Sequence, residues 1–436
     1  MRNISVISII TLLLSVGIFS CRKIDKNIIT NVELISPDAN TLIRLPDTIQ
    51  VKFKVESEKD IEFVSISIVN SNYIPLFGTH YVDTPISGET IEKAIPLKAL
   101  QNTNEAPYYI LIAVNYKEDD KWNSYFKIQL ANKPINYQGF YLFSRPFISQ
   151  TAIDFYDQNL EKTFFIQTDG EYIDSEILNF YGKLFLLSHT PAKLKAYSVA
   201  EQQLVWEAEP QFPYPEYTTI ETDVNRVYGA MENGQIVGYS EINGQQQLVA
   251  ERLVDSIPEK ISIIENYIIA AYQSRSNGNR TLVTFYKSTG HKKHRRPIDY
   301  EVVSFIKTEE PDRVVIFGNR DQNGIVSMFS AQNNSFEDTH QFEIGKIGAI
   351  CKVKDEDFII SVENKLYSYN WPQKNLTLLM EFEDIPFIIE YEHLSGRIIV
   401  LFSNRLIIYQ FSGMIEIADL EMENTLKGLQ LFYQYE

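Results

Sequence analysis

The chain has 436 residues, of which 44% are hydrophobic and 13% aromatic, and its formal net charge is -17. This apolar fraction excludes wholesale disorder, and the length suits two or three domains of ordinary size. The negative charge argues against nucleic acid as the main partner, because a phosphate backbone would be repelled on average. Short runs of Val, Ile, Tyr and Phe recur throughout, so we expect an all-β protein.

The first 20 residues have the pattern of an export signal. Arg2 precedes a mostly apolar run over 4–19, which is shorter than the roughly 20 residues of a membrane span. The run ends in Ile18-Phe19-Ser20-Cys21, which resembles a bacterial lipobox. The resemblance implies cleavage before Cys21, lipidation of its thiol and acylation, for example with palmitate, of the new terminus. The alternative is an uncleaved anchor helix with an unmodified Cys21.

Residues 21–30 are expected to be a tether, and their charge bears on the membrane face. Arg22, Lys23 and Lys26 make this segment basic. Surface-lipoprotein export signals in some Gram-negative bacteria are acidic runs just after the cysteine. We therefore expect a lipid anchor in the outer membrane on its periplasmic face, with surface exposure as the alternative.

Residues 31–133 are expected to form one small all-β domain. Apolar and polar residues alternate over 49–55 and 61–69, which is typical of half-buried strands. Further short strands are predicted at 32–35, 91–95, 108–116 and 122–130. This spacing indicates a β-sandwich. The domain resembles the immunoglobulin-like and fibronectin type III-like modules that follow lipid anchors in bacterial exported proteins.

A repeat extends from Tyr137 to Glu436. Successive units start about 40 residues apart, which is the period of propeller blades. The last predicted strand has no strands of its own after it, and the first segment lacks an innermost strand, so the two complete one blade. The sequence therefore predicts a seven-bladed β-propeller over 137–436 that is closed by the C-terminal strand, with six or eight blades as alternatives. The predicted innermost strands are 175–181, 217–223, 260–266, 301–307, 347–353, 386–392 and 427–433.

One blade also carries a family resemblance. The stretch 194–206, LKAYSVAEQQLVW, has a Leu-rich strand, a short polar turn and an aliphatic strand that ends in Trp206. It resembles the repeat of quinoprotein-like (PQQ-like) propellers, and the blade pattern in general is similar to WD40-like propellers. Quinoprotein enzymes need a cofactor-stacking Trp and calcium ligands in the propeller centre. The sequence marks no such set, so we expect no cofactor.

The stretch 287–297, KSTGHKKHRRP, is strongly basic in an acidic chain. The repeat places its second half in the fourth, outermost strand of a blade. Charge on an exposed edge blocks pairing with another chain, so one interpretation is a protected edge. The other is an electropositive rim that meets anionic lipid headgroups, lipopolysaccharide phosphates or an acidic partner protein. The residues concerned are His291, Lys292, Lys293, His294, Arg295 and Arg296.

Few patterns indicate catalysis or metal binding. The sequence has no Walker A loop, no G-x-S-x-G and no H-E-x-x-H. The segment 319–324, NRDQNG, is compatible with a short calcium loop or with an ordinary hairpin turn. The acidic runs at 118–120 and 355–357 are expected to be solvated turns, and Cys351 a buried thiol.

Taken together, these patterns favour a non-enzymatic scaffold or accessory subunit of an outer-membrane protein complex. Its propeller would bind envelope proteins, such as an outer-membrane barrel, without a metal or nucleic acid. The architecture resembles the propeller lipoprotein subunit of outer-membrane protein assembly machinery. The alternative is a glycan- or ligand-binding envelope lipoprotein, with Phe212, Tyr214 and Tyr217 as stacking residues. A hydrolase or lyase would require a carboxylate pair or an ion at the propeller centre.

Overall fold

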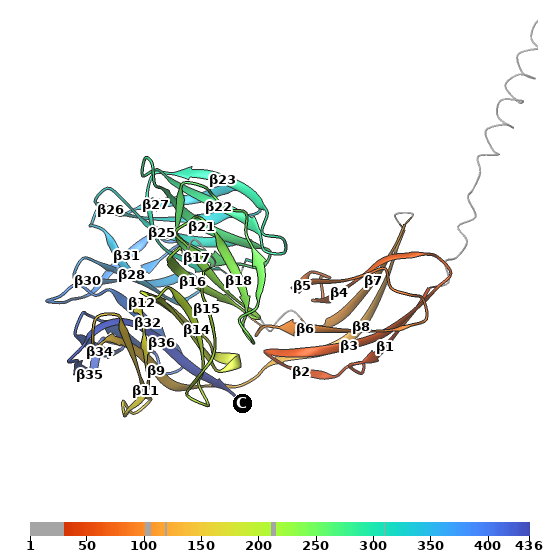
Figure 1. Ribbon diagram of the computed structural model, residues 1–436, viewed down its shortest axis with the longest axis horizontal. Helices are drawn as coiled ribbons and strands as arrows, with labels where there is room; N and C mark the ends of the chain where they lie inside the picture. Colours follow the sequence, from red (N-terminus) through yellow and green to blue (C-terminus); the bar gives the residue numbers. More distant parts are fainter. Residues whose placement is uncertain (1–29, 101–105, 118–119, 211–214, 309) are drawn as a thin grey trace, which may run out of the picture. The chain divides into compact units, whose positions relative to one another are not determined.

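A computed structural model describes residues 30–436 except 101–105, 118–119, 211–214 and 309. The export signal, the tether and Cys21 lie outside the described residues. The described chain consists of strands joined by turns, with one 3-10 turn at Asn179–Tyr181, which confirms the all-β class (Figure 1). None of its helical segments has the length and apolar character needed to cross a membrane. The chain divides into two compact units.

The N-terminal unit contains two sheets, of three and five strands. Strand β3 shows why they form. Ile49, Val51, Phe53 and Val55 are buried while the residues between them are not, because successive side chains point to opposite faces of a strand. The smaller sheet has the order β1-β3-β6, with β1 Thr30–Ser36, β3 Asp47–Ser57 and β6 Thr90–Leu97. The larger has the order β2-β8-β7-β4-β5, with β2 Leu42–Leu45, β4 Ile61–Val69, β5 Pro75–Asp83, β7 Tyr108–Tyr116 and β8 Lys121–Asn132.

The C-terminal unit consists of seven four-stranded antiparallel sheets among the described residues. Six of them are built from four consecutive strands. The seventh combines β9, β10 and β11 with the last strand of the chain, β36. In this closing sheet, β9 is Ile135–Arg145, β10 Gln150–Asp157, β11 Lys162–Asp169 and β36 Thr425–Tyr435.

The consecutive sheets have the following strands. The first two contain β12 Glu171–Leu178, β13 Lys183–His189, β14 Lys193–Ser198 and β15 Gln203–Ala208, then β16 Tyr217–Asp223, β17 Arg226–Met231, β18 Ile236–Ser240 and β19 Gln246–Val249. The next two contain β20 Ser256–Ile263, β21 Tyr267–Ser274, β22 Arg280–Tyr286 and β23 Lys292–Ile298, then β24 Glu301–Lys307, β25 Arg313–Arg320, β26 Asn323–Ser330 and β27 Ser335–Gln341. The last two contain β28 Ile347–Lys354, β29 Asp357–Val362, β30 Lys365–Asn370 and β31 Asn375–Glu381, then β32 Ile388–Glu392, β33 Arg397–Leu401, β34 Arg405–Gln410 and β35 Ile415–Glu421.

The first strands of these sheets form a closed ring. Strands β12, β16, β20, β24, β28, β32 and β36 contact one another in that order, and β36 contacts β12. Strand β36 also pairs along β9, which joins the end of the chain to the start of the unit. A ring of four-stranded sheets that is closed in this way is a β-propeller. The predicted role of the C-terminal strand is therefore confirmed.

The core lies between neighbouring sheets. Second strands are apolar on both sides because each is covered by two sheets; in β13, for example, Phe185 and Leu187 pack with the β16–β19 sheet, whereas Leu184 and Leu186 pack with β9 and β10. Phe185 contributes to a cluster with Val227 of the next sheet, and both are fully buried. This packing holds the first strands at fixed positions around the centre of the ring.

Two predicted first strands are displaced in the structure. The prediction of 175–181 is wrong at both ends, since β12 is Glu171–Leu178 and is followed by the 3-10 turn. The prediction of 260–266 likewise falls late, since β20 is Ser256–Ile263. Each strand contains a register shift, between Tyr172 and Asp174 and between Pro258 and Lys260, but this does not explain the displacement, because β16 and β24 contain the same kind of shift and have the predicted bounds.

Chain direction defines two faces of the propeller. First strands all begin at what we call the entry face, where a fourth strand connects to the next sheet and where second and third strands are joined. The exit face carries the turns between first and second strands and between third and fourth strands. Loops 146–149, 250–255, 342–346 and 382–387 belong to the entry face.

Candidate functional site

The centre of the ring contains a level of seven equivalent residues. In the six consecutive sheets, each is paired with the third residue of the second strand; in the closing sheet, Gln430 is paired with Tyr141 of the longer β9. Three of these residues are glutamates, and Glu390, Gln430, Glu176 and Glu221 occupy adjacent positions in the ring. The seven residues are Glu176, Glu221, Ser262, Ile306, Cys351, Glu390 and Gln430.

Lys307 adds a cation to this level and completes what we call the axial cluster, namely Glu176, Glu221, Glu390 and Lys307. Its Nζ lies 2.6 Å from Oε1 of Glu221, so the lysine extends from β24 past β20 to β16. The side chains of Lys307 and Glu221 are 43% and 20% exposed, which shows that solvent reaches the cluster.

Burial within the ring disfavours charge on these carboxyl groups. It raises the pKa of Glu390 to about 7. Burial, followed by the carboxylates of Glu221 and Asp174, raises the pKa of Glu176 well above its usual range. Burial also raises the pKa of Glu221 although Lys307 opposes it, and the Glu221 carboxylate in turn raises the pKa of Lys307. The pKa of Glu390 therefore lies near neutral pH.

Other acidic groups near the centre are held by structural hydrogen bonds. Asp174 accepts a hydrogen bond from Thr219 Oγ1 at 2.8 Å and one from the Ile220 amide at 3.2 Å, which ties β12 to β16. Glu392 is fully buried and accepts hydrogen bonds from the amides of Leu394 and Ser395 at 2.7 and 2.8 Å. These carboxylates stabilise the ring and are not available to a ligand.

The structure places three carboxyl groups at one level of the ring, and the sequence did not reveal this. Among the described residues, no group of three His, Cys, Asp or Glu side chains is placed to hold a metal ion. Cys351 of the same level is buried, and burial raises its pKa, so this thiol is an unreactive part of the core. An alignment of the predicted second strands with one another would have shown that Glu176, Glu221 and Glu390 occupy equivalent positions.

The basic stretch forms β23, which is the outermost strand of its sheet. Several of its cations hold this edge in place. Lys292 pairs with Glu251 at 2.6 Å. Lys293 Nζ lies 4.2 Å from the centre of the Tyr267 ring and donates to its hydroxyl at 2.9 Å. Arg296 donates to the carbonyl of Asn334 at 2.8 Å and lies over Phe336.

The remaining basic residues of this strand are less involved in the fold. His291 and Arg295 are exposed, and His294 is half-buried. The structure thus shows an edge that is fixed by Lys292, Lys293 and Arg296, with further basic groups that face solvent. Binding of an anionic partner by this stretch stays a prediction.

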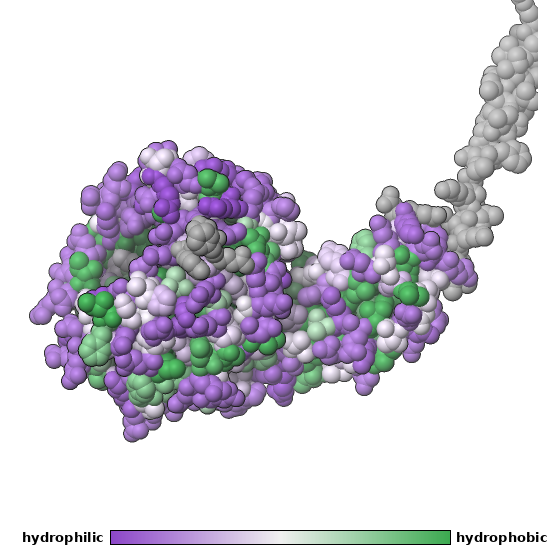
Figure 2. All heavy atoms as spheres, viewed as in Figure 1, coloured by the Kyte–Doolittle hydropathy of each residue, from purple (hydrophilic) through white to green (hydrophobic). Residues whose placement is uncertain are grey.

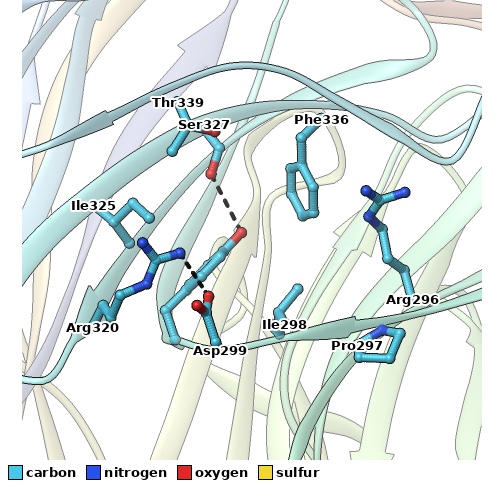
Figure 3. A pocket seen from close by; sticks show the side chains of 10 residues that line it. Arg296, Pro297, Ile298, Asp299, Arg320, Ile325, Ser327, Phe336 and Thr339 are labelled. Atoms are coloured by element: carbon cyan, nitrogen blue, oxygen red, sulfur yellow. Dashed lines mark hydrogen bonds and ion pairs between the residues drawn. The ribbon is translucent and has the colours of Figure 1, made fainter.

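A cavity of about 330 Å³ lies at the end of β23, between its sheet and the next one (Figure 3). In Figure 3, Arg296 and Arg320 lie on opposite sides of this cavity, and Phe336 lies between them. Arg320 pairs with Asp299 at 2.6 Å. The cavity is lined by Arg296, Pro297, Ile298, Asp299, Tyr300, Arg320, Ile325, Ser327, Phe336 and Thr339.

Of the predicted stacking residues, Tyr217 lies among the described residues, and it is buried. Phe212 and Tyr214 lie outside the described residues. Tyr217 is the first residue of β16 and is 3% exposed, and its hydroxyl lies 3.0 Å from that of Tyr239. Because the ring is packed inside the core, Tyr217 offers no face to a sugar.

The segment 319–324 is a hairpin turn between β25 and β26, with Asp321 in the left-handed region at a φ of 54°. Both polar atoms of the Asn319 amide bond to the backbone of Ile347, at 2.9 and 2.8 Å. The first oxygen expected of a calcium loop is therefore occupied. Of the acidic runs, 118 and 119 lie outside the described residues, while Asp355 and Asp357 pair with Lys352 and Lys354.

Six exposed apolar side chains lie in four loops of the entry face. The side of the molecule that is seen in Figure 2 is mostly hydrophilic, with hydrophobic residues interspersed. Ile148 and Phe147, in the turn between β9 and β10, are 88% and 67% exposed. The exit face carries Ile242 and Leu394. The exposed apolar set of the entry face is Phe147, Ile148, Val254, Ile344, Ile385 and Phe387.

No protein-family model and no curated protein sequence matches the chain. Among solved structures, the computationally designed Ika8 protein is similar at 10% identity and a TM-score of 0.49, over 69% of this chain and 97% of that one. The β-propeller domain of Cps50 (Swd1) from Myceliophteria thermophila is similar at 9% identity and a TM-score of 0.49, over 60% of this chain and 90% of that one. The assignment of a propeller rests on the closed ring of sheets.

Proposed function

We propose that the chain is a lipid-anchored envelope protein that binds partner proteins through the entry face of its propeller. It would be attached through Cys21 to the periplasmic face of the outer membrane. The N-terminal unit is an immunoglobulin-like sandwich over 31–133, and the seven sheets are the blades of the propeller over 137–436. The protein would act as a non-enzymatic scaffold or accessory subunit of an outer-membrane complex.

The observation that supports partner binding is the apolar set of the entry face. Apolar surface in water is unfavourable by about 25 cal/mol per Å². Single exposed apolar residues are ordinary, but a set gathered on one face is typical of an interaction surface. Ile148 and Val254, for example, are 88% and 78% exposed and lie in loops that connect strands of the propeller.

The charge of β23 indicates the chemistry of the partner. Arg295 and His291 face solvent on a chain whose formal net charge is -17. A partner with an apolar patch and a nearby acidic segment would complement both features, and opposite charges would speed its association. An envelope protein, such as the soluble face of an outer-membrane barrel, fits this description.

The test is affinity purification of the tagged, lipidated protein from mildly solubilised envelopes, followed by mass spectrometry. We expect a stoichiometric envelope protein with the wild type and its loss with Phe147→Ser combined with Ile148→Ser. The matched control is Ile242→Ser combined with Leu394→Ser, which removes exposed apolar residues from the exit face and should retain the partner. Recovery of the protein alone, under conditions that preserve a known envelope complex, would contradict the proposal.

A further inference from the structure

The cavity at the end of β23 has the dimensions of a small ligand site. Its volume of about 330 Å³ lies at the lower end of the range of about 300–1,000 Å³ for such sites. Its inner surface is formed by residues of the core, since Ile325, Ser327 and Tyr300 are 0%, 1% and 5% exposed. Because its walls belong to two adjoining sheets, the cavity is preformed.

The residues that line the cavity carry an excess of positive charge, with two arginines and one aspartate. Asp299 is the only acidic residue of the lining, and it pairs with Arg320 at 2.6 Å. Arg296 has no carboxylate partner among the described residues; its NH1 donates to the Asn334 carbonyl, and its plane lies 5.0 Å from the centre of the Phe336 ring. A guanidinium has five N–H donors, so Arg296 retains donors for an anion.

Two further groups are left with hydrogen-bonding capacity. The Nε of Arg320 is buried and has no partner among the described residues. The hydroxyls of Tyr300 and Ser327 lie 3.3 Å apart, a long separation for two hydroxyl groups. A ligand oxygen, or a water held by a ligand, would complete the hydrogen bonding of the two hydroxyls.

The rest of the lining is apolar. Ile298, Pro297, Ile325 and Phe336 form walls that favour a hydrocarbon or aromatic body. A cation would be repelled by the two guanidinium groups. The second negative charge of a dianion would be repelled by the Asp299 carboxylate. One free guanidinium beside apolar walls is complementary to a single carboxylate, which it can bind through two parallel hydrogen bonds.

We propose that this cavity binds a small organic monoanion, namely a carboxylate joined to a short apolar body, with Arg296 as the residue that binds the carboxylate. The site does not depend on partner binding at the entry face, so either proposal can fail without the other.

The test is a fluorine NMR titration of the full chain in mild detergent, with 4-fluorophenylacetate as the probe. The amine 4-fluorophenethylamine has a similar body and the opposite charge, and both probes are also titrated into detergent alone. We expect saturable binding of the acid and none of the amine. We expect Arg296→Gln to raise the Kd of the acid about tenfold, because the variant loses a charge-assisted pair.

Two more variants keep the test decisive if Arg296→Gln does not fold. Thr339→Trp keeps both arginines but fills the cavity from its exposed rim, and it should abolish binding. Arg405→Gln removes an arginine that pairs with Asp419 in another sheet, and it should bind the acid as the wild type does. Binding of the amine as tight as that of the acid, undiminished binding by Thr339→Trp, or no saturable binding of the acid would overturn the proposal.

Discussion

Replacement of Glu390 by Gln should stabilise the protein, and only above mildly acidic pH. Burial raises the pKa of this carboxyl group from 4.5 to about 7, and no cation offsets the effect. The folded protein therefore binds the proton more tightly than the unfolded chain does. Stability contributed by the protonated group is complete below about pH 4.5 and falls as the pH rises toward 7.

The magnitude follows from the two pKa values. One pKa unit corresponds to about 1.4 kcal/mol, so the ionised Glu390 destabilises the folded state by up to about 3 kcal/mol. Glutamine has nearly the same shape and never ionises. We therefore expect Glu390→Gln to differ little from the wild type near about pH 5 and to be more stable by about 2–3 kcal/mol near about pH 8.

The assay is urea unfolding followed by tryptophan fluorescence. Trp122 belongs to the N-terminal unit, whereas Trp206 and Trp371 belong to the propeller, so a Trp122→Phe background reports on the propeller alone. The matched control is Glu392→Gln, two residues further along β32. Glu392 accepts three hydrogen bonds, and its replacement should destabilise the protein instead. A stability difference for Glu390→Gln that does not change with pH would refute the reasoning.

Three further changes test the ring and its turns. Deletion of 425–436 removes β36 and leaves β9 as an unpaired edge beside an open ring, so we expect loss of cooperative unfolding and aggregation, measured by fluorescence and light scattering; a monomeric deletion variant that unfolds like the wild type would contradict ring closure. Phe185→Ala should lower the free energy of unfolding by about 3–5 kcal/mol, because the side chain is fully buried between two sheets, and an effect below about 1 kcal/mol would mean that the site is not packed as described. Asn319→Ala should cost about 1–3 kcal/mol through the lost bonds to Ile347, while calcium should leave the melting temperature of the wild type unchanged; a calcium-dependent rise that Asn319→Ala abolishes would restore the calcium interpretation.

The sequence predicted those parts of the fold that depend on local pattern. The strands at 217–223 and 301–307 have the predicted bounds. The role of β36 could be predicted because it has no strands after it and β9–β11 lack one. Strand β12 begins four residues before its predicted start, and its register shift beside Tyr172 does not account for this, because β16 and β24 contain the same kind of shift.

The candidate sites depend on contacts between distant residues, which the sequence does not display. Glu176, Glu221 and Glu390 lie at the same level of the ring only because each is paired with the third residue of its second strand. The exposure of Tyr217 was misjudged because the Pro-rich segment before it suggested a loop tip. Its hydroxyl lies within hydrogen-bond distance of the Tyr239 hydroxyl, two strands away, inside the core.

The residues that stabilise the ring and the residues proposed to bind ligands or partners lie in different parts of the propeller. Ile306 and Cys351 occupy the same level of the ring as the three glutamates, so packing there does not require a carboxylate. The partly buried Glu390, whose pKa is raised, destabilises the folded protein at neutral pH, whereas the neighbouring second strands stabilise it through fully buried apolar side chains. The entry-face set and the Arg296 cavity lie outside this central region. Changes there should alter binding while leaving the ring intact. Changes at the second strands should lower the stability of the ring.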